Sequence, residues 1–103
     1  MERGEIRWYT FKSPNKKRPV VILTRNSALN FLGEVTIALI TSTIRDIPTE
    51  VILDQNDGMK TLSAINLDHI QTVSKGKIGA YISKLSDSKL DEIKPALLFA
   101  LGF

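Results

Sequence analysis

Two short polar segments carry side chains that could act on a phosphate group. Lys16-Lys17-Arg18 leads into an apolar run, and its guanidinium could bind a phosphate through two hydrogen bonds. Thr41-Ser42-Thr43 offers three hydroxyl groups where a predicted strand ends. Charge runs usually only keep a surface soluble, and hydroxyls at strand ends commonly bond to nearby backbone, so neither segment is specific alone.

A third polar segment, at Asn66, Asp68, His69 and Gln71, interrupts apolar strand residues. Its donors and acceptors suit the base edges of a splayed single-stranded RNA. His69 is the only histidine, and because its charge changes near neutral pH it could act as a general acid or base. A hydrogen-bonded structural role is equally open for it. With one histidine and no cysteine, we expect no metal site.

The composition predicts one domain over residues 1–103, in the cytoplasm. Hydrophobic residues make up 43% of the 103 residues, enough for a single core. The absence of cysteine gives no support to an oxidising compartment, and the apolar runs are too short to cross a membrane. The net charge of +3 permits a phosphate-backbone partner, and no glycine-rich loop or catalytic motif indicates a cofactor. A domain this short would gain stability as a homodimer.

The apolar pattern predicts five to seven short strands and one C-terminal helix, a mostly β fold of the α+β class. The predicted strands are residues 4–11, 20–23, 35–41, 49–53, 62–66, 70–73 and 78–82. Ser13-Pro14-Asn15 predicts a turn, and residues 16–18 complete that loop before Pro19 opens the second strand. Residues 27–32 predict a helical turn closed by Gly33, and 45–48 predict a loop. Asn56-Asp57-Gly58 predicts a hairpin turn whose flanking strands pair.

A change of period marks the terminal helix. Leu90, Ile93, Leu97 and Leu101 recur every three or four residues, and Ser86 is the expected N-cap. Pro95 would remove the hydrogen bond to the carbonyl of Asp91, which predicts a kink or restart there.

Short stretches in a fixed order run over almost the whole chain. They are Arg3-Gly4-Glu5-Ile6, Arg18-Pro19-Val20-Val21, Thr41-Ser42-Thr43-Ile44-Arg45, Pro48-Thr49-Glu50-Val51, His69-Ile70-Gln71-Thr72-Val73, Ile78-Gly79, Leu85-Ser86 and Ala100-Leu101-Gly102. None is specific alone, but their ordered combination resembles the MazF/PemK family of toxin endoribonucleases.

This resemblance implies an SH3-like small barrel of the MazF/CcdB type that forms a homodimer and has a cognate antitoxin. It also implies sequence-specific, metal-independent cleavage of single-stranded RNA to 2′,3′-cyclic phosphate and 5′-hydroxyl ends, without a cofactor. The family's catalytic arginine falls on Arg18 and its catalytic threonine or serine on Thr41, with His69 as a further candidate for proton transfer. The expected RNA contacts are Lys16, Lys17, Ser42, Asn66, Asp68, His69, Gln71 and Lys77.

Two departures from the family pattern bear on activity. The loop between the first two strands is short and lacks the family's acidic-Gln-Gly stretch, and the family's Gln-Ile-Arg is here His69-Ile70-Gln71, which changes the expected base preference. Two alternatives stay open. One is a CcdB-like toxin that binds gyrase, and the other is a nucleic-acid-binding barrel without catalysis, which would show salt-sensitive RNA binding but no cleavage.

Overall fold

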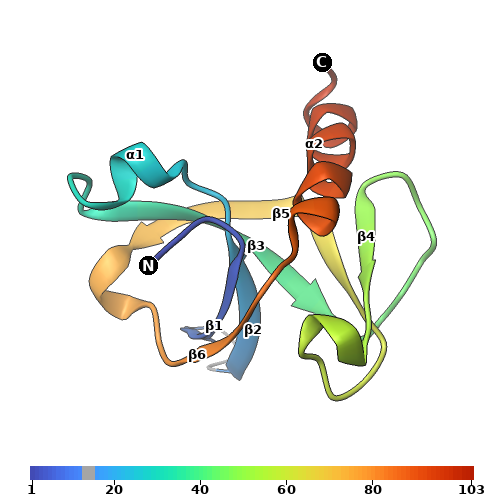
Figure 1. Cartoon of the computed structure of the whole chain (residues 1–103), viewed down its shortest axis with the longest axis horizontal. Coiled ribbons are helices and arrows are strands. Elements are labelled where there is room, and N and C mark those ends of the chain that lie inside the picture. Colours follow the sequence, from blue (N-terminus) through green and yellow to red (C-terminus); the bar gives the residue numbers. More distant parts are fainter. Residues whose placement is uncertain (13–15) are drawn as a thin grey trace.

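The computed structural model describes residues 1–12 and 16–103, which form one antiparallel sheet and a C-terminal helix (Figure 1). The strands are β1 (Glu5–Phe11), β2 (Lys16–Ile22), β3 (Glu34–Thr41), β4 (Glu50–Leu53), β5 (Ser63–Ser74) and β6 (Tyr81–Lys84), in the sheet order β4-β5-β3-β2-β1-β6. The helical elements are α1 (Asn26–Leu29), α2 (Asp87–Leu101) and the 3-10 turns η1 (Gln55–Asp57) and η2 (Lys75–Lys77). The predicted mostly β fold with a C-terminal helix is confirmed, whereas the predicted turn at 13–15 lies outside the described residues.

The pleat of the central strands divides the apolar side chains between two cores. Val21 of β2 opposes Ala38 of β3, and both pack with Ile93 of α2 in the first core. Ile22 opposes Ile37, and this pair belongs to the second core, on the other face of the sheet. Because side chains alternate along a strand, β2 and β3 each serve both cores, and each buried aliphatic side chain contributes about 1.5–3 kcal/mol.

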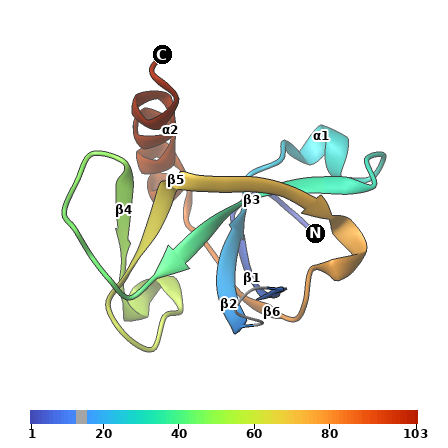
Figure 2. The ribbon, with the colours of Figure 1, turned by 180° about the vertical axis from the view of Figure 1, so that it is seen from behind.

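Strand β5 is one continuous strand, where the sequence predicted two (Figure 2). Asn66 pairs with Leu39 of β3, and Ile70 pairs with Ala38, so residues 67–69 have no counterpart on β3 and the strand bends. The Asn66 side chain accepts a hydrogen bond from the backbone N–H of Asp68 at 2.9 Å. The polar segment between the two predicted strands is therefore a bend inside one strand.

Strand β2 begins at Lys16, and Pro19 is its fourth residue, not its first. On β1, the N–H of Trp8 donates to the Ala80 carbonyl at 3.0 Å and its carbonyl accepts from Gly79 at 2.8 Å, so these groups point away from β2. Pro19, which is opposite Trp8, therefore points its nitrogen toward β3, whose ladder with β2 starts only at Val20. A proline costs no ladder bond at such an unpaired position.

The predicted pairing across Asn56-Asp57-Gly58 is confirmed, because β4 and β5 are antiparallel neighbours. The connection is longer than a two-residue turn. It contains η1, capped by reciprocal hydrogen bonds between Asp54 and Asp57, and Gly58 has φ of 91°. A Cβ atom on Gly58 would approach the Ser83 side chain to 2.5 Å, so glycine meets both a conformational and a spatial requirement there.

Helix α2 starts at the predicted cap, with Ser86 Oγ accepting from the Lys89 N–H at 3.3 Å, and it continues through Pro95 without a restart. Asp91 and Pro95 are both exposed, so water can satisfy the carbonyl that the proline leaves unbonded.

Helix α1 spans 26–29 rather than 27–32, and β6 begins at Tyr81 because η2 and its exit occupy the preceding residues. Within the described ranges, no helix is long and apolar enough to cross a membrane.

Candidate functional site

Arg18 and Thr41 lie on neighbouring strands at the same end of the sheet. In the β2–β3 ladder Val20 opposes Leu39 and Val21 opposes Ala38. Arg18 lies two residues before Val20 and Thr41 two residues after Leu39, so the alternation of side chains along each strand puts both on the face of the Val20–Leu39 pair. Both side chains are partly exposed. Residues opposed in an antiparallel pair point to the same face, so a guanidinium and a hydroxyl share one face of the sheet.

The hydroxyl of Thr41 is oriented by its own loop. Its Oγ1 accepts a hydrogen bond from the N–H of Thr43 at 3.1 Å. A hydroxyl that accepts one bond keeps its proton for donation. Thr41 is therefore able to donate to an anionic oxygen placed near Arg18.

The loop that follows Thr41 is fixed at its far end by Glu50. The Glu50 carboxylate accepts from the backbone N–H groups of Arg45 at 3.0 Å and Asp46 at 2.9 Å. Asp46 has φ of 56°, a left-handed conformation that aspartate tolerates better than most residues. The carboxylate thus compensates for a strained turn in the connection between β3 and β4.

A cleft of about 380 Å³ borders the same strand ends, and we call it the cationic cleft. Its lining residues are Trp8, Lys16, Lys17, Arg18, Pro19, Ile40, Thr41, Ser42, Gly58, Met59, Lys60, Thr61, Ser63 and Ile82. No aspartate or glutamate is among them, and the cations come from β2 and from the connection after η1. Such a lining favours an anionic ligand with apolar parts.

Sequence reasoning missed the walls of this cleft, above all Trp8. Trp8 follows Ile6 at a two-residue spacing, so it shares the face of a fully buried side chain, and this alternation was the available signal. Lys60 and Met59 enter the cleft only because the β4–β5 connection folds over it. No local pattern in the sequence predicts that contact.

The polar segment of β5 divides into two pairs of residues. Asn66 is buried and Asp68 accepts from the hydroxyl of Thr49 at 2.7 Å, so this pair stabilises the bend. His69 and Gln71 are exposed. Gln71 opposes Ile37 of β3, four residues before Thr41, which puts it on the Arg18 face.

Lys77 is in η2, beyond the end of β5 that pairs with the start of β3. The cationic cleft borders the other end of β3, and Lys77 is not among its lining residues. The structure therefore brings together Lys16, Lys17, Arg18, Thr41 and Ser42, but it does not bring Lys77 to them.

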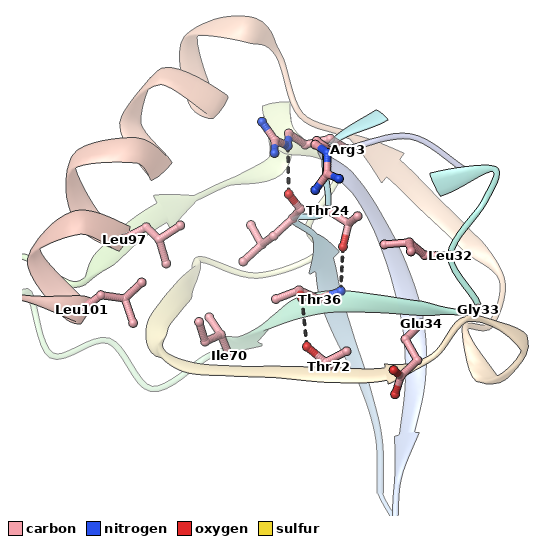
Figure 3. Close-up of a pocket in the computed structure, with 12 residues that line it drawn as sticks. Arg3, Thr24, Leu32, Gly33, Glu34, Thr36, Ile70, Thr72, Leu97 and Leu101 are labelled. Carbon is pink, nitrogen blue, oxygen red and sulfur yellow. Dashed lines mark hydrogen bonds between the residues drawn. The ribbon is translucent and has the colours of Figure 1, made fainter. Parts of the chain in front are cut away.

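A second hollow of about 580 Å³ lies at the opposite ends of β2 and β3 (Figure 3). This threonine pocket is lined by Arg3, Leu23, Thr24, Arg25, Leu32, Gly33, Glu34, Thr36, Ile70, Thr72, Leu97 and Leu101. Its polar groups bond to one another: the Thr36 N–H donates to Thr24 Oγ1 at 2.8 Å, and the Thr36 and Thr72 hydroxyls are 3.0 Å apart. It is larger than the cationic cleft, and unlike the cleft it is lined by a carboxylate, that of Glu34.

In the part of the chain that the structure describes, no three side chains of His, Cys, Asp or Glu are grouped in a way that could hold a metal ion. The polar groups that line the cationic cleft at the strand ends are the Arg18 guanidinium, the hydroxyls and the lysine ammonium groups.

Comparison with known proteins identifies the relatives of this arrangement. Residues 2–101 match the PemK-like, MazF-like toxin family of type II toxin–antitoxin systems. The probable endoribonuclease MazF5 of Mycobacterium tuberculosis (strain H37Rv) is 34% identical over 100 residues, which cover 96% of this chain and 91% of that protein. Endoribonuclease MazF3 of Mycobacterium tuberculosis (strain CDC 1551) is 39% identical over 88 residues, covering 85% and 82% respectively.

Solved structures show the same fold. The Mycobacterium tuberculosis toxin MazF-mt6 superimposes with a TM-score of 0.89 at 32% identity, covering 96% of this chain and 97% of that one. An endoribonuclease from a mycobacterial species, solved with its cognate antitoxin, has a TM-score of 0.90 at 26% identity and covers 100% and 96%. On the family match, the identities and the shared curled sheet with its terminal helix, this chain belongs to the PemK-like, MazF-like toxin family of type II toxin–antitoxin systems.

Proposed function

We propose that this chain is a sequence-specific endoribonuclease that acts as the toxin of a toxin–antitoxin pair. The observation that carries the proposal is that Arg18 and Thr41, at adjoining ends of β2 and β3, line one cleft together with further cations and without carboxylates. Relatives that cover most of the chain are named endoribonucleases, which supports RNA as the substrate. Cytoplasmic location is part of the proposal, because cellular RNA is met there.

The reaction we propose is an internal transesterification that uses no metal. The 2′-oxygen of one nucleotide forms a bond to the adjacent phosphorus, the bond from phosphorus to the 5′-oxygen breaks, and a proton passes from the attacking oxygen to the leaving one. A 2′,3′-cyclic phosphate and a 5′-hydroxyl result. Arg18 stabilises the extra negative charge on the phosphate, and Thr41 donates its hydroxyl proton to a phosphate oxygen.

The remaining roles follow from exposure. Lys16, Lys17 and Ser42 bind the RNA backbone at the cleft, and Gln71 contacts bases on the Arg18 face. His69, exposed at the bend of β5, is the candidate for a further proton transfer. A change in the pH dependence of kcat for His69→Gln would support that role, and an unchanged profile would restrict His69 to base contact.

The decisive experiment is cleavage of mixed single-stranded RNA in excess EDTA, with cut ends mapped by sequencing. We expect cuts at one short motif with 5′-hydroxyl ends, and a loss of about 100- to 1000-fold in rate for Arg18→Ala. Arg25→Ala is the matched control, because Arg25 is an exposed arginine in the threonine pocket. Intact RNA with folded wild-type protein would instead favour the gyrase-directed or binding-only alternatives.

A cognate antitoxin is the proposed protein partner. One solved relative carries its cognate antitoxin, and a cleft without carboxylates suits an acidic segment that folds on binding. Co-expression with the protein encoded by the adjacent gene should yield a stable complex and should suppress RNA cleavage. Cleavage that continues in such a complex would contradict this part of the proposal.

We also propose a homodimer. Side chains near the end of α2 leave large apolar areas exposed: Leu98 is 41% exposed, Phe99 61%, Leu101 53% and Phe103 90%. Several large apolar side chains exposed at one end of a helix are typical of an interface. Sedimentation equilibrium should show dimers of wild-type protein and monomers of Phe99→Asp, whereas Leu62→Asp, at an exposed leucine of the β4–β5 connection, should stay dimeric.

A further inference from the structure

Trp8 is a feature of the cationic cleft that the proposed chemistry of Arg18 and Thr41 does not use. Trp8 opposes Pro19, one residue along from the Tyr9–Arg18 pair, so the pleat turns the indole to the face opposite the guanidinium. The cleft thus reaches around the strand ends from the reacting groups. The half-buried indole lines the part of the cleft on the face of the sheet away from Arg18.

The backbone that carries this ring is fixed. The Trp8 N–H donates to the Ala80 carbonyl at 3.0 Å, and the Trp8 carbonyl accepts from the Gly79 N–H at 2.8 Å. A Cβ atom on Gly79 would lie 2.8 Å from the Trp8 carbonyl oxygen and 3.4 Å from Trp8 Cβ, so only glycine permits the approach. An aromatic side chain has only two rotatable bonds, so it loses little conformational freedom when a ligand packs on it.

The surroundings of the ring combine an apolar wall with phosphate-binding groups. Pro19, Met59 and Ile82 line the cleft together with the indole, and Lys60 and Thr61 line it from the connection. The ammonium of Lys17 lies over the indole at 5.0 Å from the ring centroid. Lys17 is exposed, so its charge can move to a phosphate when a planar group takes its place on the ring.

We propose that the cationic cleft is a nucleobase subsite, in which Trp8 stacks on a base near the cleaved phosphate and Lys17 and Lys60 bind the flanking phosphates. The subsite rests on the proposed function, since its ligand is the RNA substrate. A planar base joined to phosphates uses both the apolar wall and the cations, whereas an acidic peptide would use only the cations.

The intrinsic fluorescence tests the subsite directly, because Trp8 is the only tryptophan. The probe is mixed-sequence single-stranded RNA that is fully 2′-O-methylated, so that the attacking oxygen is blocked. We expect saturable quenching of Trp8 emission that follows binding measured by anisotropy of a labelled probe. Inorganic polyphosphate and poly-L-glutamate should change the emission much less. Binding of the RNA without a change in emission, or equal changes with either polyanion, would overturn the subsite.

Kinetics provide the second test. Trp8→Leu should raise KM on the order of ten- to one-hundred-fold with little change in kcat, and Trp8→Phe should restore part of the affinity. Tyr81→Leu is the matched control, because Tyr81 is an exposed aromatic residue with Arg7 5.8 Å above its ring and it does not line the cleft. A Trp8→Leu variant that lowers kcat with KM unchanged would assign Trp8 a structural role. If that variant does not fold, the Phe variant and the emission data still decide.

The two proposals fail separately. RNA that quenches Trp8 but stays intact with unmodified 2′-hydroxyls would overturn cleavage and support the subsite. RNA that is cleaved while Trp8 emission and the KM of Trp8→Leu stay unchanged would overturn the subsite alone.

Discussion

The cationic cleft and the threonine pocket occupy opposite ends of β2 and β3, yet their polar groups are employed differently. In the threonine pocket, Thr36 is bonded to Thr24 and Thr72, and Arg3 Nε donates to the Leu23 carbonyl at 2.8 Å (Figure 3). In the cleft, Thr41 keeps a proton to donate. The cleft combines Arg18 and three lysines with the Thr41 hydroxyl and has no carboxylate, whereas Glu34 lines the larger pocket, so the charge of the lining is more informative than volume.

The largest expected contrast comes from removing a hydroxyl at each end of β3. Thr41→Val should lower kcat for RNA cleavage by about 100-fold, because it deletes the proposed donor to the phosphate. Thr36→Val should leave cleavage near the wild-type rate and affect only the free energy of unfolding. Single-turnover cleavage and thermal unfolding of both variants check this. Equal loss of activity in the two would abolish the distinction between the two hollows.

Two glycines, Gly79 against Trp8 and Gly33 in the threonine pocket, should differ in how much stability their replacement costs. Gly79→Ala should destabilise the fold by about 1–3 kcal/mol, because the new Cβ would meet the Trp8 carbonyl oxygen at 2.8 Å. Gly33→Ala in the threonine pocket meets nothing within 4 Å and should be tolerated. Urea unfolding monitored by circular dichroism measures both. A stable Gly79→Ala protein with unaltered Trp8 emission would contradict the rigid placement of the indole.

A smaller contrast is expected for single charges. Lys60→Ala should weaken RNA binding a few-fold and lower the slope of log affinity against log salt by about 0.7, as expected for one phosphate contact on a single strand. Arg25→Ala, which removes a cation from the threonine pocket, should leave the slope unchanged. Anisotropy titrations at several salt concentrations distinguish these results, and identical slopes for all three proteins would remove Lys60 from the RNA path.

The smallest effect concerns an ion pair that lines neither hollow. The hydrogen bond and charge of Lys84 lower the pKa of Glu2 below its usual value of 4.5. Stability from this pair is thus present above the unfolded pKa of the carboxyl and is lost as pH falls through the folded value. Since both groups are exposed, Glu2→Gln should only slightly reduce the fall of the melting temperature as the pH is lowered through the acid range. A large change at neutral pH would show that the pair has another structural role.

Much of the fold was predictable from local pattern. The strand at 35–41, the paired strands around Asn56-Asp57-Gly58 and the helix capped by Ser86 all follow from alternation, turn chemistry and capping. Two of the predictions that were wrong, a break in β5 and a strand start at Pro19, share a cause. Whether a polar residue or a proline ends a strand depends on which neighbour its backbone faces, and that is a property of the sheet.

The part of the candidate site that lies in recognisable sequence segments was predictable, whereas the part that distant segments bring together was not. The chemistry of Arg18 and Thr41 was not specific alone; the family resemblance singled them out, and in the structure both line one cleft. Trp8 and Lys60 did not stand out, because their role depends on contacts between segments more than 40 residues apart. Asn66 was assigned to RNA by its polarity, but its side chain is bonded within the bend.

The bend of β5 has a consequence for how such a protein changes over generations. Residues 67–69 have no partner on β3, so replacing His69 leaves every hydrogen bond of that ladder intact. Mutation can then vary this exposed side chain without shifting the pairing of β3 with its neighbours. On the proposed function, recognition of the RNA sequence could change over generations while Arg18 and Thr41 keep their places beside the cleft.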